Sequence, residues 1–357
     1  MSNPIIIIGA GLSGLCSAWS LHKAGIPFRI LESNERIGGR IQSIAGEHSE
    51  GPFELGATWL GDQHQHLNEL LKQLGVERFE QYNKGKAFYE VMSFLPPQAF
   101  EVPYKTTPYY RIKGGSIALV EALAKAIGRA NIQLKTTVQS IQYDGEQLLI
   151  GTKEGPSYTA DQVILSLPPQ LAAERIRFEP ALPNEQLQAM QQTPTWMSHS
   201  IKFIVEYERP FWREESKAGM AISQTGMISE VHDHSNIDET AFSLMGFLSA
   251  KAAALPTPKR KDAVLAHLAR LFGPSASKYR QYIEKEWSKE PHTAAAHTQW
   301  LNAHPPYGQA ILRQAHFDHR LFFSGSETSA VYGGYMEGAV YAGLWVAKQI
   351  LKKLEKI

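Results

Sequence analysis

The chain has 357 residues, which is enough for about two domains with buried cores. Its 36 basic residues nearly balance its 35 acidic ones, and no long run has a single sign. This balance gives no charged surface for nucleic acid or for an anionic membrane. The densest apolar run, residues 5–8, is far too short to span a bilayer. We therefore expect a globular protein that binds a small molecule, with no nucleic-acid partner and no membrane partner. The oligomeric state stays open.

The cellular compartment is indicated by two features. The first residues lead directly into a predicted strand, without the basic segment, apolar stretch and cleavage site of a signal peptide. The single cysteine, Cys16, allows no internal disulfide and fits a reducing compartment. Together they favour the cytoplasm.

The first predicted elements are a strand, a glycine turn, a helix and a second strand, at residues 4–8, 9–11, 12–24 and 28–31. A helix follows at 65–74 and is ended by Gly75, and another follows at 117–127 with Ser116 as its N-cap. Strands are predicted at 137–143, 148–152 and 162–167. This order favours a βαβ unit that carries a small added sheet.

After residue 192 the pattern alternates between polar and apolar residues. This alternation predicts strands at 198–207, 219–223, 226–232 and 241–248. A helix is predicted at 260–272, a short strand at 321–323 and a final helix that ends at 354. The fold class we predict is α/β, a Rossmann-like domain with a second α+β domain built on a mixed sheet. The first domain would comprise residues 1–79, 111–191 and 295–357, and the second residues 80–110 and 192–294.

Residues 9–14 read GAGLSG and lie between the first strand and the first helix. In such a motif Gly9 allows the tight turn, Gly11 lets the backbone approach a pyrophosphate, and Gly14 lets the helix pack against the strand. Glu32 ends the second strand, where its carboxylate can accept hydrogen bonds from a ribose. The motif predicts a dinucleotide site but does not separate FAD from NAD, and a glycine turn without a nucleotide is the alternative.

Two further motifs resemble one family. Residues 38–40 read GGR directly after the second strand, and residues 323–328 and 333–339 read FSGSET and GGYMEGA near the end of the chain. Both blocks resemble those of the flavin amine oxidases, which include monoamine and polyamine oxidases. The resemblance covers nearly the whole chain and implies FAD as cofactor. The motifs do not match a covalent flavin link, because Ala296 occupies the position of the linking cysteine, so we expect FAD to be bound non-covalently.

The resemblance also implies roles for individual residues around FAD. Arg40 matches a phosphate-binding arginine, Val138 a valine whose backbone meets the adenine, and Glu327 a glutamate near the ribitol and pyrophosphate. Residues Gly56, Ala57 and Thr58 match the segment that passes over the flavin, Trp287 matches a tryptophan near the flavin, and the backbone N–H of Met336 matches a donor to the charge on reduced flavin.

Three residues are expected to take part in catalysis. Lys202 matches the strand lysine that holds a water at flavin N5, and burying a lysine in an apolar strand costs several kcal/mol unless it has a partner. Tyr335 matches one wall of an aromatic cage that orients the amine. His297 falls at the position of the second wall, where the chain departs from the family pattern. The implied reaction moves a hydride from the carbon beside an amine nitrogen to flavin N5, after which the imine is hydrolysed and O2 is reduced to hydrogen peroxide.

Alternatives remain at this point. A desaturase or porphyrinogen oxidase relative shares both motif blocks, and a non-catalytic FAD-binding protein is favoured by the short segment 80–110, since family members enclose the substrate with a longer helical segment. The histidine pairs 64/66 and 232/234 lack partners at metal-ligand spacing, so we predict solvated turns and no metal there.

Overall fold

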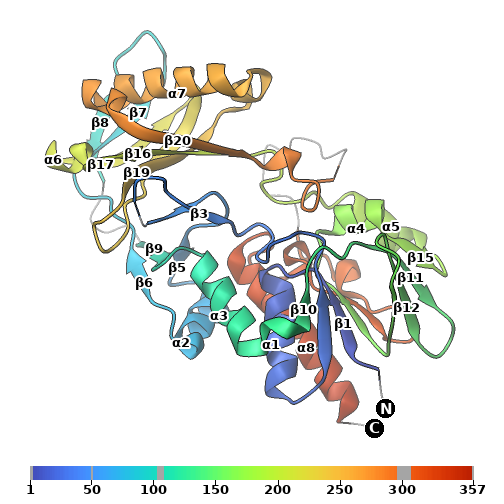
Figure 1. Ribbon diagram of the computed structural model, residues 1–357. Coiled ribbons are helices and arrows are strands. Elements are labelled where there is room, and N and C mark those ends of the chain that lie inside the picture. The colour runs from blue at the N-terminus through green and yellow to red at the C-terminus, as the bar shows by residue number, and fades with distance from the viewer. Residues whose placement is uncertain (1–2, 50, 103–107, 296–306, 356–357) are drawn as a thin grey trace.

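The computed structural model describes residues 3–49, 51–102, 108–295 and 307–355. These residues form two parts, one with a parallel sheet and both chain ends, the other with a large mixed sheet (Figure 1). The predicted fold class, α/β with a second domain on a mixed sheet, is confirmed.

The first part is centred on a five-stranded parallel sheet. In spatial order its strands are β10 (Ile132–Gln133), β2 (Phe28–Leu31), β1 (Ile5–Ile8), β14 (Val163–Leu165) and β21 (Leu321–Phe323). The central strand β1 is buried on both faces, because Ile5 and Ile7 pack into one core and Ile6 and Ile8 into another. An unbroken apolar run is typical of such a strand.

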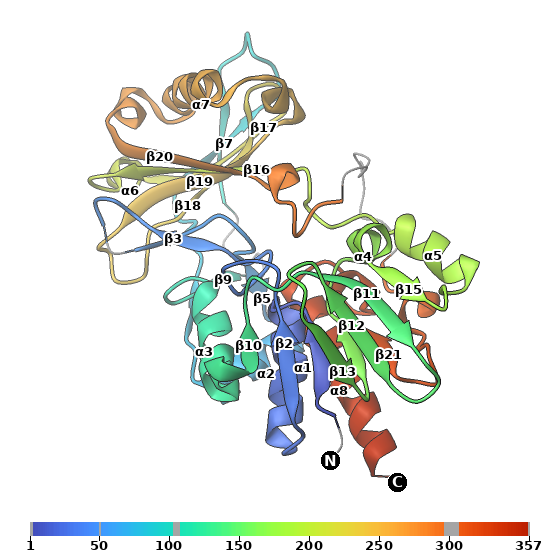
Figure 2. The ribbon, with the colours of Figure 1, turned by 45° about the vertical axis from the view of Figure 1, so that its right-hand side comes forward.

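Helices cover one face of this sheet and a second sheet covers the other (Figure 2). The helices are α1 (Leu12–Lys23), α2 (Gln65–Leu74), α3 (Ile117–Ile127) and α8 (Met336–Leu354). The second sheet has the order β13 (Ser157–Ala160), β12 (Leu148–Thr152), β11 (Val138–Tyr143) and β15 (Arg177–Glu179), and helices α4 (Pro169–Arg175) and α5 (Asn184–Gln191) follow β14 and β15.

The second part is built on a seven-stranded sheet that is antiparallel except for one parallel pair, β17 with β7. Its order is β20 (Tyr279–Glu286), β16 (Ile201–Tyr207), β19 (Phe242–Leu248), β18 (Ile228–Asp233), β17 (Lys217–Ser223), β7 (Lys86–Glu90) and β8 (Gln98–Glu101). The face of this sheet that is turned away from the first part packs on α7 (Thr257–Phe272). The short helix α6 (Phe211–Glu214) follows β16. Residues alternate along β16, so Phe203 and Val205 face α7, whereas Lys202 and Ile204 face the first part.

Two small sheets lie where the parts meet. One pairs β3 (Ser43–Ala45) with β4 (Pro52–Glu54), and the other has the order β5 (Leu60–Gly61), β9 (Tyr109–Ile112) and β6 (Arg78–Glu80). Phe53 and Leu55 pack on Ile204 of β16, so the chain after β4 contacts the near face of the large sheet. The predicted domain cuts at 79/80 and 110/111 fall inside β6 and β9, and the domain bounds stay a prediction.

Local predictions were partly correct. Gly75 has the left-handed conformation (φ 66°) expected at the end of α2, but α7 begins at Thr257 and not at 260. Ser116 is the N-cap residue of α3, yet its side chain makes no capping bond to the helix. Its hydroxyl donates to the carboxylate of Glu54 instead, so the predicted N-cap position is confirmed but its side chain does not cap the helix.

Candidate active site

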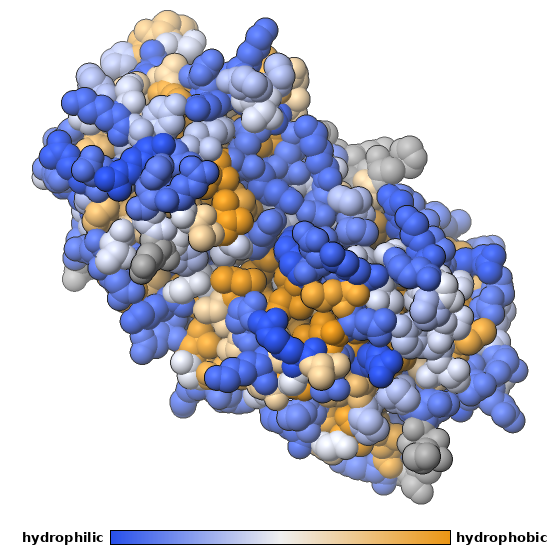
Figure 3. All heavy atoms as spheres, in the orientation of Figure 1, coloured by the Kyte–Doolittle hydropathy of each residue, from blue (hydrophilic) through white to orange (hydrophobic). Residues whose placement is uncertain are grey.

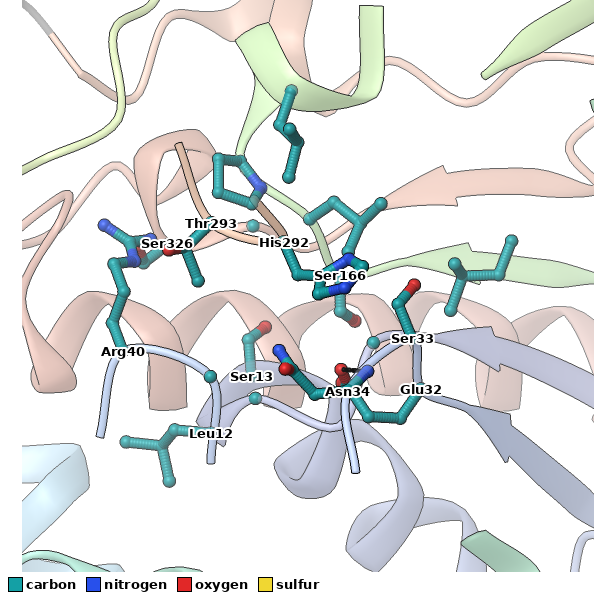
Figure 4. Close-up of a pocket in the computed structure, with 18 of the residues that line it drawn as sticks. Leu12, Ser13, Glu32, Ser33, Asn34, Arg40, Ser166, His292, Thr293 and Ser326 are labelled. Atoms are coloured by element: carbon teal, nitrogen blue, oxygen red, sulfur yellow. Dashed lines mark hydrogen bonds between the residues drawn. The ribbon is translucent and has the colours of Figure 1, made fainter. Parts of the chain in front are cut away.

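A cavity of about 490 Å³ opens at the carboxyl ends of the parallel strands, which is where doubly wound sheets bind their ligands. Figure 4 shows Arg40 and Ser326 at one end and Glu32 and Ser33 at the other, with Ser13 of α1 between them. Seen as in Figure 1, the surface between the two parts carries a group of apolar side chains (Figure 3). Of the predicted site residues, the following line the cavity: Gly9, Gly11, Glu32, Arg40, Ala57, Val138, Tyr335 and Met336.

The three motif glycines differ in their surroundings. Gly9 has φ 104° and makes the turn after β1. A Cβ on Gly14 would lie 2.1 Å from the carbonyl oxygen of Gly9, so only glycine lets α1 approach the strand. A Cβ on Gly11 would meet nothing within 4 Å, and Gly11 lines the cavity, so the space beside it is left for a ligand. This division of roles is the one the motif predicts.

The carboxylate of Glu32 lines the cavity and is also fixed by the glycine turn. Its Oε2 accepts the backbone N–H of Ala10 at 2.7 Å, and its Oε1 accepts that of Asn34 at 2.8 Å. These bonds orient the carboxylate at the end of β2. Its contact with a ribose stays a prediction.

Arg40 and Glu327 form an ion pair between segments 287 residues apart. Arg40 Nη1 lies 2.7 Å from Glu327 Oε1 and Nη2 lies 3.0 Å from Oε2, and Nη2 also donates to Ser326. Glu327 is fully buried, and although burial alone would raise its pKa, the charge and hydrogen bonds of Arg40 lower it. Arg40 reaches the cavity, whereas Glu327 lies behind it, so the predicted contact of Glu327 with the cofactor is untested.

The N-terminus of α8 faces the same cavity. The helix begins at Met336, and Met336 and the N-cap residue Tyr335 both line the cavity. The unpaired N–H groups and the helix dipole at this end favour a negative charge, as predicted from the sequence. The Tyr335 ring is 37% exposed and lies 5.6 Å from the ring of Trp196.

Lys202 is buried in β16, with only 1% of its surface exposed. Its Nζ donates to the carbonyl oxygen of Gly56 at 2.7 Å and to Oγ1 of Thr58 at 2.6 Å. Burial lowers the pKa of Lys202 from its ordinary 10.5 to about 7. Gly56 and Thr58 flank Ala57, which lines the cavity, so the buried amino group lies directly behind the cavity wall.

Trp287 supports the same wall from another element. It is buried, and its Nε1 donates to the carbonyl oxygen of Leu55 at 2.8 Å. The structure therefore brings Trp287, Lys202, Gly56 and Thr58 together behind the cavity. His297 lies outside the described residues, and its role stays a prediction.

The histidines of the two pairs are not in solvated turns, so this expectation is wrong. His66 lies in α2 and contacts Glu337, His232 lies in β18, and His64 and His234 are buried. Burial lowers the pKa of both side chains. Nδ1 of His64 accepts the backbone N–H of Gly61, and Nε2 of His234 accepts that of Glu54. Both rings are therefore held by backbone groups. Within the described ranges no group of three His, Cys, Asp or Glu residues is arranged to hold a metal ion.

Sequence reasoning missed residues that join the two parts. The backbone of Trp196 accepts a bond from Arg40 and donates one to Glu327, which places its ring beside Tyr335. Glu54 and Arg111 form a buried pair, and Glu54 directly precedes the segment that contains the acceptors of Lys202, Gly56 and Thr58. No local motif marks any of them, and an isolated charged residue at the end of a strand is the only signal for Glu54.

The site fits FAD on structural grounds. The open space at Gly11, the helix N-termini of α1 and α8 and the guanidinium of Arg40 suit a pyrophosphate, and Val138 extends the cavity along the sheet. The single cysteine of the sequence, Cys16, is fully buried in α1, which fits a non-covalent cofactor. Fold and site thus define a dinucleotide-binding protein whose cofactor cavity adjoins a second domain.

The family is shown by sequence. A model described as flavin containing amine oxidoreductase matches residues 12–101 and 92–351. The chain therefore belongs to the flavin-containing amine oxidoreductases. The predicted resemblance, the flavin cofactor, the enzyme class and the amine oxidase activity are confirmed over the desaturase and non-catalytic alternatives.

Similar proteins include a probable flavin-containing monoamine oxidase A from Dictyostelium discoideum, 29% identical over 98% of this chain and 98% of that protein. The flavin-containing amine oxidase A of Sus scrofa is 25% identical over 99% of this chain and 86% of its own. Among solved structures, cyclohexylamine oxidase from Brevibacterium oxydans IH-35A has a TM-score of 0.87 at 23% identity, covering 99% of this chain and 100% of its own. Putrescine oxidase bound to putrescine has a TM-score of 0.85 at 22% identity, covering 99% of each.

The chain is shorter than the Dictyostelium relative. The alignment with the Dictyostelium protein spans 451 positions, more than the 357 residues here, so that relative has segments without a counterpart. The two family matches overlap at residues 92–101, in and before β8. The match to the family model is therefore split within the short segment 80–110 noted in the sequence. In the part of the chain that is described, no helix is long and apolar enough to cross a bilayer.

Proposed function

We propose that this amine oxidase acts on an amine that carries a second positive group, such as a diamine. Bound FAD supplies the hydride acceptor and passes the electrons to O2. Lys202 would act behind the flavin, and Tyr335 would orient the amine in front of it. The proposal on the substrate depends on a carboxylate, Glu230, on the strand β18.

The observation that carries the proposal is a row of three side chains across the large sheet. Lys202 of β16 pairs with Phe247 of β19, which in turn pairs with Glu230 of β18, so all three extend from the same face. Neighbouring strands lie about 4.8 Å apart, which puts Glu230 about 10 Å across the sheet from Lys202. Trp59 packs between the parts, with its ring 5.5 Å from Nζ of Lys202.

Glu230 is suited to bind a cation. Its side chain is 41% exposed, in contrast to the buried Lys202. The contact with His232, whose Nε2 lies 3.8 Å away, and the charge of Lys202 hold the pKa of Glu230 below its ordinary value despite its partial burial. The carboxylate is therefore charged at neutral pH and partly exposed, on the same face of the sheet as Lys202. Putrescine oxidase, one of the similar structures, binds a diamine.

The test compares butane-1,4-diamine with butylamine, using hydrogen peroxide release by the FAD-loaded enzyme. Wild type should prefer the diamine, and Glu230→Gln should lower kcat/KM for it about 10- to 100-fold, since a hydrogen bond to a charged group contributes about 1.5–3 kcal/mol. Turnover of butylamine should change little. Glu208→Gln, an exposed carboxylate directly after β16, is the matched control. Equal losses for both amines, or a wild type that prefers butylamine, would contradict the proposal.

A further inference from the structure

The carboxylate of Glu54, at the end of β4, is fully buried at the N-terminus of α3. Its Oε1 accepts the backbone N–H of Ser116 at 2.8 Å and the hydroxyl of Ser116 at 2.7 Å. A negative charge is stabilised at a helix N-terminus, where N–H groups lack partners within the helix. Glu54 thus accepts both donors of the N-cap residue Ser116, and it fixes the end of β4 to α3.

The other side of Glu54 is held by two further elements. Its Oε2 lies 3.5 Å from Nε of Arg111, a buried residue of β9. Its backbone N–H donates to Nε2 of His234 at 3.1 Å, directly after β18. Arg111 in turn donates to the carbonyl oxygen of Ser235 at 2.7 Å. One residue therefore connects α3, β9 and the large sheet.

The chain that follows Glu54 carries both acceptors of Lys202. Gly56 and Thr58 come two and four residues later, and their oxygens are the two that receive Nζ of Lys202. A Cβ on Gly56 would lie 2.1 Å from the carbonyl oxygen of Arg40, so this segment has little room to move. The position of the amino group relative to the cavity thus depends on where Glu54 anchors the segment.

Charges face Lys202 from several elements. Burial lowers its pKa most, Glu54 of β4 and Glu230 of β18 raise it, and Arg111 of β9 lowers it. The fully buried His234 has a pKa well below its ordinary value, chiefly because of burial. On β20 the register partner Lys285 is paired with Glu290. Glu54 is therefore the buried anion among these groups.

We propose that Glu54 is a positioning residue for Lys202: it anchors the segment that supplies both acceptors of the amino group and places a buried negative charge two residues before the first acceptor, Gly56. The proposal rests on the flavin chemistry of the family and is independent of the substrate class proposed above. Among the described residues, Glu54 combines two contacts: it binds the N-terminus of α3, and it lies directly before the segment that contains the acceptors of Lys202.

The test uses Glu54→Gln, which keeps an oxygen acceptor for Ser116 and removes the charge. FAD-loaded protein is reduced with dithionite and mixed with O2 at a series of pH values, so that no amine is needed. A second readout is the pH dependence of thermal unfolding of the cofactor-free protein, compared with the same variant in a Lys202→Met background. Ser116→Ala keeps the charge and loses one hydrogen bond, and Glu47→Gln removes an exposed carboxylate from the turn after β3.

Both readouts in Glu54→Gln should show the Lys202 transition about one pH unit lower, because an opposite charge that favoured the protonated form is lost. The shift should vanish when Lys202 is methionine. Ser116→Ala should lower the melting temperature without moving the transition, and Glu47→Gln should change neither. If Glu54→Gln is destabilised but keeps the wild-type transition, Glu54 is a structural cap only and the proposal is wrong. An unchanged Glu54→Gln in both readouts would equally overturn it.

Discussion

Nζ of Lys202 lies 2.6 Å from Oγ1 of Thr58, and this contact joins the large sheet to the wall of the cofactor cavity. The hydroxyl of Thr58 in turn donates to the carbonyl oxygen of Gly56, which also accepts from Lys202. A neutral lysine has two N–H donors and a protonated one has three. The two acceptors match the two N–H donors of the neutral form, so the site is suited to the amine form of Lys202.

This arrangement makes stability depend on pH. Burial lowers the pKa of Lys202 to about 7, whereas the unfolded chain keeps the ordinary value near 10.5. Between these values the unfolded chain binds more protons, so the free energy of unfolding should rise with pH across this window. Below about pH 7 the folded protein carries the cost of a buried ammonium group. Lys202→Met should therefore be the more stable protein at pH 6, and its advantage should shrink toward pH 10.

Thermal unfolding of the cofactor-free proteins from pH 6 to pH 10 measures this difference. Lys86→Met replaces an exposed lysine on the same sheet and should follow the wild type throughout. A constant difference between Lys202→Met and wild type would show that Lys202 does not titrate in this range.

In the FAD-loaded enzyme, Lys202→Met should also slow reoxidation of reduced flavin by O2, by about 100-fold if the amine assists proton transfer.

The motif glycines should separate cofactor binding from folding. Gly11 has φ −71° and ψ 173°, which alanine adopts freely, and its Cβ would enter open cavity space. Gly11→Ala should melt like the wild type without FAD but bind FAD at least 10-fold more weakly. Gly14→Ala places its Cβ 2.1 Å from the carbonyl oxygen of Gly9 and should destabilise the cofactor-free protein by about 1–3 kcal/mol.

Calorimetry of the cofactor-free variants and titration with FAD give the two quantities. Gly25→Ala is unsuitable as a control because its φ of 69° disfavours alanine. Ala18, buried within α1, shows that alanine itself is tolerated along this helix. If Gly11→Ala bound FAD as wild type does, the cofactor would not approach this turn.

Local sequence patterns predicted those elements whose form depends on neighbouring residues in the chain. The run at residues 5–8, the glycine turn and the apolar strand around Lys202 each depend on neighbours in the chain, and each has the predicted form. The role of Ser116 could not be predicted this way, because its partner Glu54 lies 62 residues earlier. His234 was misplaced for the same reason, since the backbone N–H that holds it comes from residue 54, 180 residues earlier.

The ion pair between Arg40 and Glu327 gives the last prediction. Glu327 is fully buried, and Arg40 is 25% exposed toward the cavity, so Arg40→Met leaves an uncompensated buried carboxylate. Breaking a buried pair in this way costs about 3–5 kcal/mol. The double variant Arg40→Met with Glu327→Gln removes the stranded charge and should recover a large part of that loss.

FAD affinity should behave differently from stability. Arg40 lines the cavity and Glu327 does not, so both variants that lack Arg40 should bind FAD weakly, whereas Glu327→Gln alone should lose less affinity. Denaturant unfolding gives the free energies for the complete double-mutant cycle, and FAD titration gives the affinities. If Arg40 contacts the phosphates directly, its loss weakens FAD binding whichever residue is at position 327. Recovery of FAD binding in the double variant would therefore mean that Arg40 stabilises the fold and does not contact the phosphates.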